Sequence, residues 1–242
     1  MGWEPMYGCR ATIFSPSGDK ILNAEDFSIQ VNKVTGSDIN GDSKSDIVLE
    51  GWSGGAHCCF TYWIVPLGSD PPTALEIRNK EELSFEDMDG DGRMEIETAD
   101  GAFNHFDHLS YGFSPFPPVF LRMETSSLRD ISKHFRSKYA ERIGLFRSRL
   151  TAKQLAAFRR ADPSKASLTH VEEKKAVLEI VLAHLYSGNQ SAAWKALDEM
   201  WPPSDRKRIK ELILETRKCG ILNYVYKTCS EPYEGTLPDE KP

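Results

Sequence analysis

Short apolar runs separated by turn-forming residues fill the first half of the chain. Seven runs of three to six residues occur at 11–14, 20–22, 27–31, 46–50, 60–65, 74–77 and 95–98, with Gly, Asp, Asn, Ser and Pro between them. Short strands joined by tight turns are typical of an all-β domain. A further apolar run at 119–121 is expected to be the last strand of this domain.

After about residue 126 the apolar positions recur every three or four residues, which is the period of an α-helix. The pattern predicts a helix whose buried stripe contains Leu128, Ile131, Phe135, Tyr139, Ile143, Phe146 and Leu150. A capping box at 169–172 predicts a second helix ending near Gly188, and two more helices are expected over 191–200 and 204–218. The sequence therefore predicts an α+β protein with an N-terminal all-β domain (1–125), a C-terminal α-helical domain (126–225) and a C-terminal tail (226–242).

Two acidic loops within the β region carry the strongest chemical signal. The first loop spans residues 38–46 and the second loop spans residues 87–95, and both place oxygen-bearing side chains at positions 1, 3, 5 and 9. These residues are Asp38, Asn40, Asp42 and Asp46 in the first loop, and Asp87, Asp89, Asp91 and Glu95 in the second. Calcium takes six to eight oxygens at about 2.3–2.6 Å, and the backbone carbonyl at position 7 would complete each set. The sequence thus predicts two Ca²⁺ sites, with the side chains at position 7, Lys44 and Arg93, facing water.

The spacing within these loops excludes an EF-hand. An EF-hand has a bidentate acid at position 12 and flanking helices, whereas position 12 is Leu49 in the first loop and Thr98 in the second, and strand-like residues follow. We therefore expect calcium-binding loops in β-hairpins. An acidic turn without an ion, or a site for sodium, magnesium or manganese, remains an alternative. The second loop has four acids against three, which favours tighter binding there.

Residues 25–125, which contain both loops, resemble the calcium-binding repeats of the FG-GAP and VCBS type found in integrin α-subunits and bacterial surface proteins. The eight side chains named above match the ligand positions of that family. The first loop departs from the motif at Ser43, where glycine is usual, and two repeats are too few to close a propeller. The stretch 54–59 followed by an aromatic strand is similar to uncharacterised bacterial secreted proteins, which implies an exported protein.

Charge is distributed unevenly along the 242 residues, although the formal net charge is only −6. Residues 1–125 contain 21 acids and 8 bases, whereas residues 126–219 contain 11 acids and 20 bases. A basic face is expected on the helical half, formed by Arg142, Arg147, Arg149, Lys153, Arg159 and Arg160. This face would be solvated or docked against the acidic half, or would meet an acidic protein or anionic lipid. No nucleic-acid motif is present, so no nucleic-acid partner is expected.

The cysteines and histidines offer an alternative function. Cys219 and Cys229 are close enough in sequence to form a disulfide, and Cys9 is within possible reach of Cys58 or Cys59, which could instead pair with each other. A hydrolase would use a Cys/His site near His57-Cys58-Cys59 with His105 or His108. The simpler interpretation is that these cysteines form disulfides and the histidines pack among aromatic residues.

Residues 185–202 resemble part of a tetratricopeptide repeat, which implies two antiparallel helices with Trp194 and Trp201 in their core. The leading hypothesis is a calcium-binding secreted or periplasmic protein that acts as a binding or interaction module. Its expected partners are calcium ions and a protein or cell-surface glycan. No transmembrane segment and no signal peptide are expected in the chain as given, and an intracellular adaptor built on the helical half remains an alternative.

Overall fold

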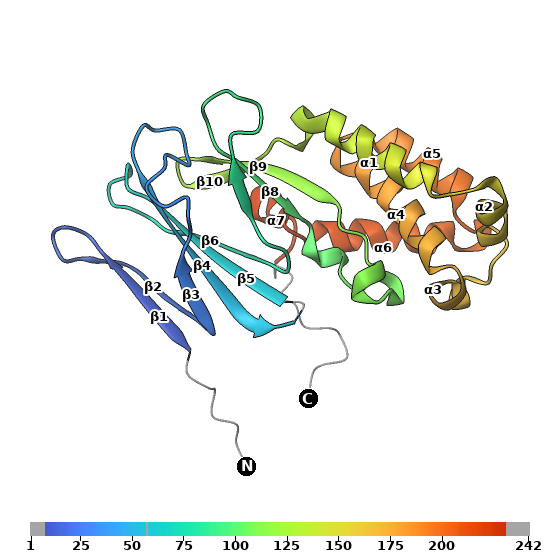
Figure 1. Cartoon of the computed structure of the whole chain (residues 1–242), viewed down its shortest axis with the longest axis horizontal. Coiled ribbons are helices and arrows are strands. Elements are labelled where there is room, and N and C mark those ends of the chain that lie inside the picture. Colours follow the sequence, from blue (N-terminus) through green and yellow to red (C-terminus); the bar gives the residue numbers. More distant parts are fainter. Residues whose placement is uncertain (1–7, 57, 231–242) are drawn as a thin grey trace, which may run out of the picture. The chain divides into compact units, whose positions relative to one another are not determined.

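The structure is a computed structural model that describes residues 8–56 and 58–230. The chain divides into two compact units, and the described part of the first, here called the β unit, comprises 8–56, 58–98 and 121–129. The second, here called the helical unit, comprises 99–120 and 130–230. An α+β fold is thereby confirmed at the level of secondary structure (Figure 1). The segment 99–120, which we expected in the β domain, belongs to the helical unit.

The β strands form a hairpin and two antiparallel sheets. The hairpin pairs β1 (Cys9–Phe14) with β2 (Lys20–Asp26). One sheet has the order β3-β4-β5-β6, formed by β3 (Ser28–Val31), β4 (Asp46–Gly55), β5 (Cys58–Pro66) and β6 (Leu75–Asn79). The other has the order β10-β9-β8-β7, formed by β7 (Ser84–Glu86), β8 (Glu95–Ala99), β9 (Pro118–Glu124) and β10 (Ser127–Asp130).

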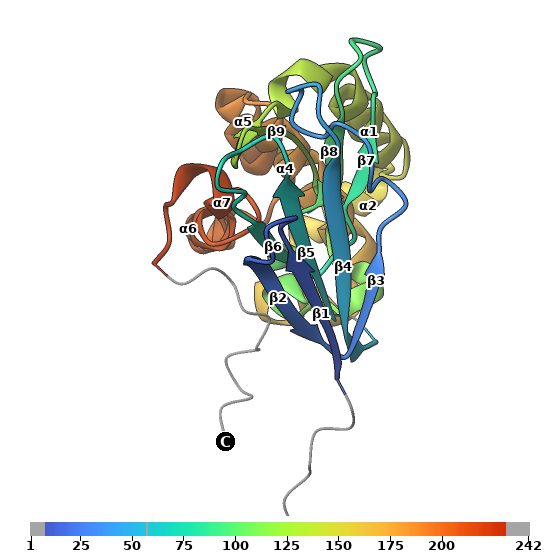
Figure 2. The same ribbon diagram turned by 90° about the vertical axis from the view of Figure 1, so that its left-hand side faces the viewer.

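The pairing of β4 with β5 is the centre of the β unit. Val48 lies opposite Ile64, and both side chains are fully buried. The next pair, Leu49 and Trp63, packs with Ala24 of β2, so the β1–β2 hairpin covers this face of the sheet (Figure 2). Because successive side chains of a strand point to opposite faces, the two pairs show that both faces of this sheet are buried, and each buried methylene contributes about 0.8 kcal/mol.

The helical unit is organised around α4 (Val171–Tyr186), whose Ile180, Val181 and Leu182 are fully buried. The helices α1 (Arg136–Ser148) and α5 (Gln190–Met200) pack against it (Figure 1). The shorter and later helices are α2 (Ala152–Phe158), α3 (Ala166–Thr169), α6 (Arg206–Lys218) and α7 (Asn223–Tyr226). Trp201 is buried as expected and packs edge-on against Phe158, with ring centroids 5.2 Å apart.

Two details of the predicted helices are wrong. Leu128 lies in β10 and a 3₁₀ turn, Ser132–Phe135, precedes α1, so the apolar stripe does not belong to one helix. The predicted capping box also fails, because the Thr169 hydroxyl donates to the carbonyl of Lys165, the residue before α3, and does not cap α4. A capping box is present instead at Thr151, where it begins α2.

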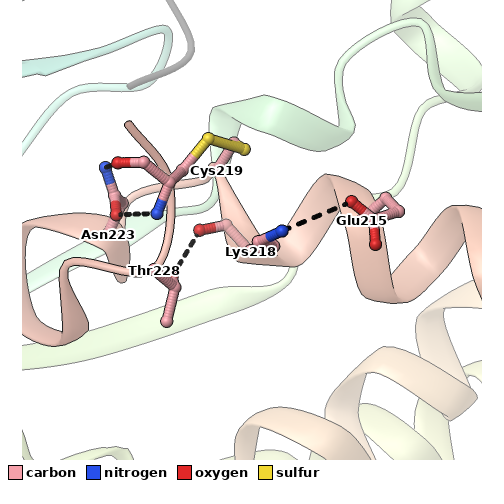
Figure 3. Close-up of a disulfide and its surroundings, with 6 residues drawn as sticks. Glu215, Lys218, Cys219, Asn223 and Thr228 are labelled. Atoms are coloured by element: carbon pink, nitrogen blue, oxygen red, sulfur yellow. Dashed lines mark hydrogen bonds and ion pairs between the residues drawn. A yellow bond between two sulfur atoms is a disulfide. The ribbon is translucent and has the colours of Figure 1, made fainter. Parts of the chain in front are cut away.

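A disulfide closes the end of α6, as expected from the sequence. Cys219 and Cys229 are bonded, and Asn223 holds the intervening turn by accepting a hydrogen bond from the Cys229 amide at 2.8 Å (Figure 3). Cys59 is also disulfide-bonded, whereas Cys9 is an exposed free thiol, so Cys9 pairs with neither Cys58 nor Cys59. Within the described ranges, none of the helices has the length and apolar character needed to cross a bilayer.

Candidate metal centre

Both acidic loops connect neighbouring antiparallel strands. The first loop lies between β3 and β4, and the second loop joins β7 to β8. In each, position 9 is the first residue of the following strand, Asp46 in β4 and Glu95 in β8. The two loops lie at the same end of the β unit (Figures 1 and 2), and the Arg93 guanidinium of the second donates to the Asn40 carbonyl of the first at 3.2 Å. The hairpin placement predicted from the sequence is confirmed.

The two loops have the same hydrogen-bond pattern at every oxygen-bearing position. The position 1 carboxylate accepts from the amides of positions 4 and 6, and the position 3 oxygen accepts from the amide of position 5. The position 5 carboxylate accepts from the amide of position 7, and the position 9 carboxylate accepts from the amide of position 2. Two segments of different sequence therefore fold their acids inward in the same way.

Left-handed backbone at positions 4 and 6 produces the tight bend of each loop. Gly41 and Gly90 at position 4 have φ of 79° and 76°, and Gly92 at position 6 of the second loop has φ of 84°. Ser43 occupies position 6 of the first loop with φ of 65°, a conformation that costs a residue with a Cβ roughly 1–2 kcal/mol. The fold thus keeps the geometry of the glycine motif where the sequence departs from it.

The carboxylates at position 9 are the most buried part of the site. Asp46 and Glu95 are both fully buried. Oδ2 of Asp46 accepts from the amide of Ile39 at 2.8 Å, but Oδ1 is buried without a hydrogen-bond partner. Burial raises the pKa of Asp46, and the nearby amides of Ile39, Leu67 and Asn40 only partly oppose this rise. A buried carboxylate oxygen without a donor is costly, and a bound cation would satisfy it.

The second loop brings its acids closest together. Carboxylate oxygens of Asp87, Asp89 and Glu95 lie within 4.8 Å of one another, the one such group of metal-ligating side chains in the part of the chain that the structure describes. Arg122 of β9 faces these acids, and its guanidinium contacts Asp89 at 3.4 Å, Asp91 at 3.0 Å and also Glu95. Arg122 was not predicted from the motifs, although a single basic residue inside the apolar run 118–123 is an available signal.

The side chains at position 7 do not both face water, which corrects the sequence prediction. Arg93 is half-buried against Gly41 and the Asn40 carbonyl, while exposed Lys44 reaches the Gly68 carbonyl at 3.3 Å. Asp42 of the first loop also lies against Gly68, where a Cβ would come within 1.7 Å of the Asp42 carboxylate. Glycine at residue 68 is therefore required for the observed position of this ligand residue.

Of the alternative Cys/His site, the structure describes Cys59, His105 and His108. Cys59 is in a disulfide, and His57 and the Cys58 side chain lie outside the described residues. His105 packs against Tyr111, with ring centroids 6.2 Å apart. The carboxylate of Asp107, which lies between these histidines in sequence, forms two salt bridges. The Lys174 ammonium and the Arg208 guanidinium each contact it at 2.6 Å. Although burial alone would raise the pKa of Asp107, hydrogen bonds from Arg208 and Lys174 hold it below its usual value.

The predicted basic face loses one member. Arg142 is directed to the fully buried Glu179 of α4, with two nitrogen–oxygen distances of 2.8 Å. The other predicted members are exposed, namely Arg147, Arg149, Lys153, Arg159 and Arg160. Arg142 therefore stabilises the packing of α1 on α4. It is not part of the exposed basic face that was predicted from the sequence.

Comparison with known proteins adds no relative. Neither a protein-family model, nor a curated protein, nor a solved structure matches the chain. The interpretation of the two loops therefore depends on their own geometry.

Proposed function

We propose that this chain is a calcium-binding protein in which Ca²⁺ has a structural role at the two hairpin loops. The observation that carries the proposal is the shared hydrogen-bond pattern, in which backbone amides orient the oxygens at positions 1, 3, 5 and 9 of both loops. At positions 5 and 9 of both loops, the backbone amide fixes one carboxylate oxygen and leaves the other oxygen to a cation. An all-oxygen site in a flexible loop favours calcium over transition metals.

The residues present fit such an ion. The first loop contains a buried carboxylate oxygen without a partner, at Asp46. The second loop gathers three acids within metal-binding distance of each other. Asp38, Asn40, Asp42 and Asp46 with the Lys44 carbonyl would hold one ion, and Asp87, Asp89, Asp91 and Glu95 with the Arg93 carbonyl would hold the other. Calcium would neutralise the mutual repulsion of these acids and stiffen the strands that they join.

The chain is best interpreted as an exported binding or interaction module. Disulfides at Cys219–Cys229 and at Cys59 support an oxidising compartment such as the periplasm or the extracellular space. The disulfide at Cys59 removes the thiol of this residue as a nucleophile, which favours binding over hydrolysis. The FG-GAP and VCBS resemblance of the loops supports a protein or a cell-surface glycan as the partner.

Equilibrium dialysis against millimolar calcium tests this proposal. The unaltered protein is expected to bind two calcium ions, and Asp87→Ala with Asp91→Ala is expected to abolish one binding event and leave the other. Asp38→Asn with Asp42→Asn should remove the complementary event, because these residues are the position 1 and position 5 ligands of the first loop. Asp19→Asn, in an exposed turn outside both loops, is the control and should bind two ions. An unchanged number of bound ions in both double variants would contradict the proposal.

A further inference from the structure

The two loops differ in one respect that their shared hydrogen-bond pattern does not suggest. At position 9 of the first loop, one oxygen of the buried Asp46 accepts from an amide and the other has no partner. At position 9 of the second loop, one oxygen of the buried Glu95 likewise accepts from the Met88 amide at 2.8 Å, but the other is bound by Arg122. The same buried position is thus unsatisfied in one loop and neutralised in the other.

On three of the four acids of the second loop, Arg122 contacts the carboxylate oxygen that the loop amides leave free. Its guanidinium contacts Oδ2 of Asp89, Oδ2 of Asp91 and Oε1 of Glu95, whereas the amides of the loop take Oδ1, Oδ1 and Oε2 of the same residues. The Arg122 side chain is only 13% exposed, and its Nε is buried without an acceptor. Its charge is therefore directed to the three carboxylates alone.

Among the described residues, none is an equivalent internal cation for the first loop. Lys44 is exposed and reaches the Gly68 carbonyl, and Arg93 reaches the carbonyl of Asn40. Both are bound to backbone oxygens in the contacts that the structure gives, so neither occupies a carboxylate oxygen of the first loop. In the contacts that the structure gives, the three carboxylates of the first loop pair with no side-chain cation, and one oxygen of Asp46 is unsatisfied.

We propose that Arg122 is an internal counter-cation that competes with calcium for the second loop. This inference rests on the proposed function, because it takes both loops as calcium sites. The first loop then fills at low calcium, and the second loop fills only when the Arg122 guanidinium moves away from its three carboxylates. The acid count of the sequence favours the second loop, but the guanidinium reverses the expected order of affinities. The protein would thereby have one permanent calcium site and one site that responds to changes in calcium concentration.

Electrostatics gives the direction and size of the effect. A divalent ion and a guanidinium within a few ångströms repel each other, and the same carboxylate oxygens cannot serve both fully. Removal of the guanidinium should therefore raise the calcium affinity of the second loop by about tenfold or more. The Arg122 guanidinium is a cation at all working pH values, because arginine is not deprotonated in proteins.

The test measures calcium affinity by isothermal titration in a background that carries Asp38→Asn and Asp42→Asn, so that the second loop is observed alone. Arg122→Gln is expected to tighten binding by about tenfold or more. Arg122→Lys, which keeps the positive charge, should stay within a few-fold of the background protein. Arg129→Gln is the matched control, because Arg129 on the neighbouring β10 pairs only with Glu124 in the contacts that the structure gives, and it should leave affinity unchanged.

Each outcome decides between the two proposals. Calcium binding with equal affinity in Arg122→Gln and its background would overturn the role of Arg122 and leave the calcium sites intact. Absence of binding to the unaltered protein and to Arg122→Gln would overturn the proposed function itself. If Arg122→Gln unfolds without calcium, it is folded in millimolar calcium and titrated with a chelator. The proposal then requires that Arg122→Gln unfold at a lower free calcium concentration than the double variant Asp91→Asn with Arg122→Gln, which lacks one ligand of the second loop. Equal instability of Arg122→Gln with and without calcium would contradict the proposal.

Discussion

In excess EDTA the β unit is expected to melt about 10–20 °C below its melting temperature in millimolar calcium. An ion that binds only the folded state adds about 2.7 kcal/mol of stability when its free concentration is 100 times Kd. In a unit of about 100 residues, each 1 kcal/mol changes Tm by about 4–8 °C. One filled loop therefore accounts for the expected shift, and a second filled loop would increase it.

Near-UV circular dichroism of the buried Trp63 and Tyr62 reports this transition, because both side chains lie in the sheet next to the loops. A variant with Asp38→Asn, Asp42→Asn, Asp87→Asn and Asp91→Asn is the control. It lacks two ligands in each loop and should melt at the same temperature in EDTA and in calcium. Identical melting of the unaltered protein in the two solutions would count against a structural role for the ion.

The acidic loops were predictable from sequence because their chemistry is local. Side chains at positions 1, 3, 5 and 9 meet amides of the same nine residues, so the spacing of the acids alone specifies the pattern. Arg122 was missed because it lies 27 residues beyond Glu95 and reaches it only through the pairing of β9 with β8. Such a contact depends on sheet order, which periodicity does not reveal.

The same limit explains the errors in the fold. The strands β7 and β10 have three and four residues, too short to give a clear alternating pattern. Leu128 fits a helical spacing with Ile131 and Phe135, but pairing in the sheet places it in a strand. Arg142 looked like a surface base because its buried partner, Glu179, lies 37 residues away in α4. Strands and helices with strong internal patterns were therefore predicted, whereas long-range pairings were not.

In the helical unit, Arg142→Met is expected to lower the free energy of unfolding by about 3–5 kcal/mol. Glu179 is fully buried, and Arg142 supplies two of its hydrogen bonds, at 2.8 Å each. Without the guanidinium, the Glu179 carboxylate retains the Phe116 amide at 3.1 Å but has no counter-charge. A buried carboxylate without a counter-charge is strongly destabilising.

Denaturant unfolding at neutral pH measures this loss. Arg142→Met with Glu179→Leu should restore most of the stability, since no buried charge remains, and Arg147→Met on the exposed face of α1 should have little effect. A single variant as stable as the unaltered protein at neutral pH would show that the pair is unimportant.

The most direct test of the central claim is a crystal structure determined with calcium present, using anomalous scattering to locate the ion. The account predicts a peak in the first loop, with oxygens of Asp38, Asn40, Asp42 and Asp46 and the Lys44 carbonyl at about 2.3–2.6 Å. At high calcium it predicts a second peak in the other loop, accompanied by withdrawal of the Arg122 guanidinium. No anomalous peak in either loop at millimolar calcium, with Asp46 Oδ1 still without a partner, would contradict the account.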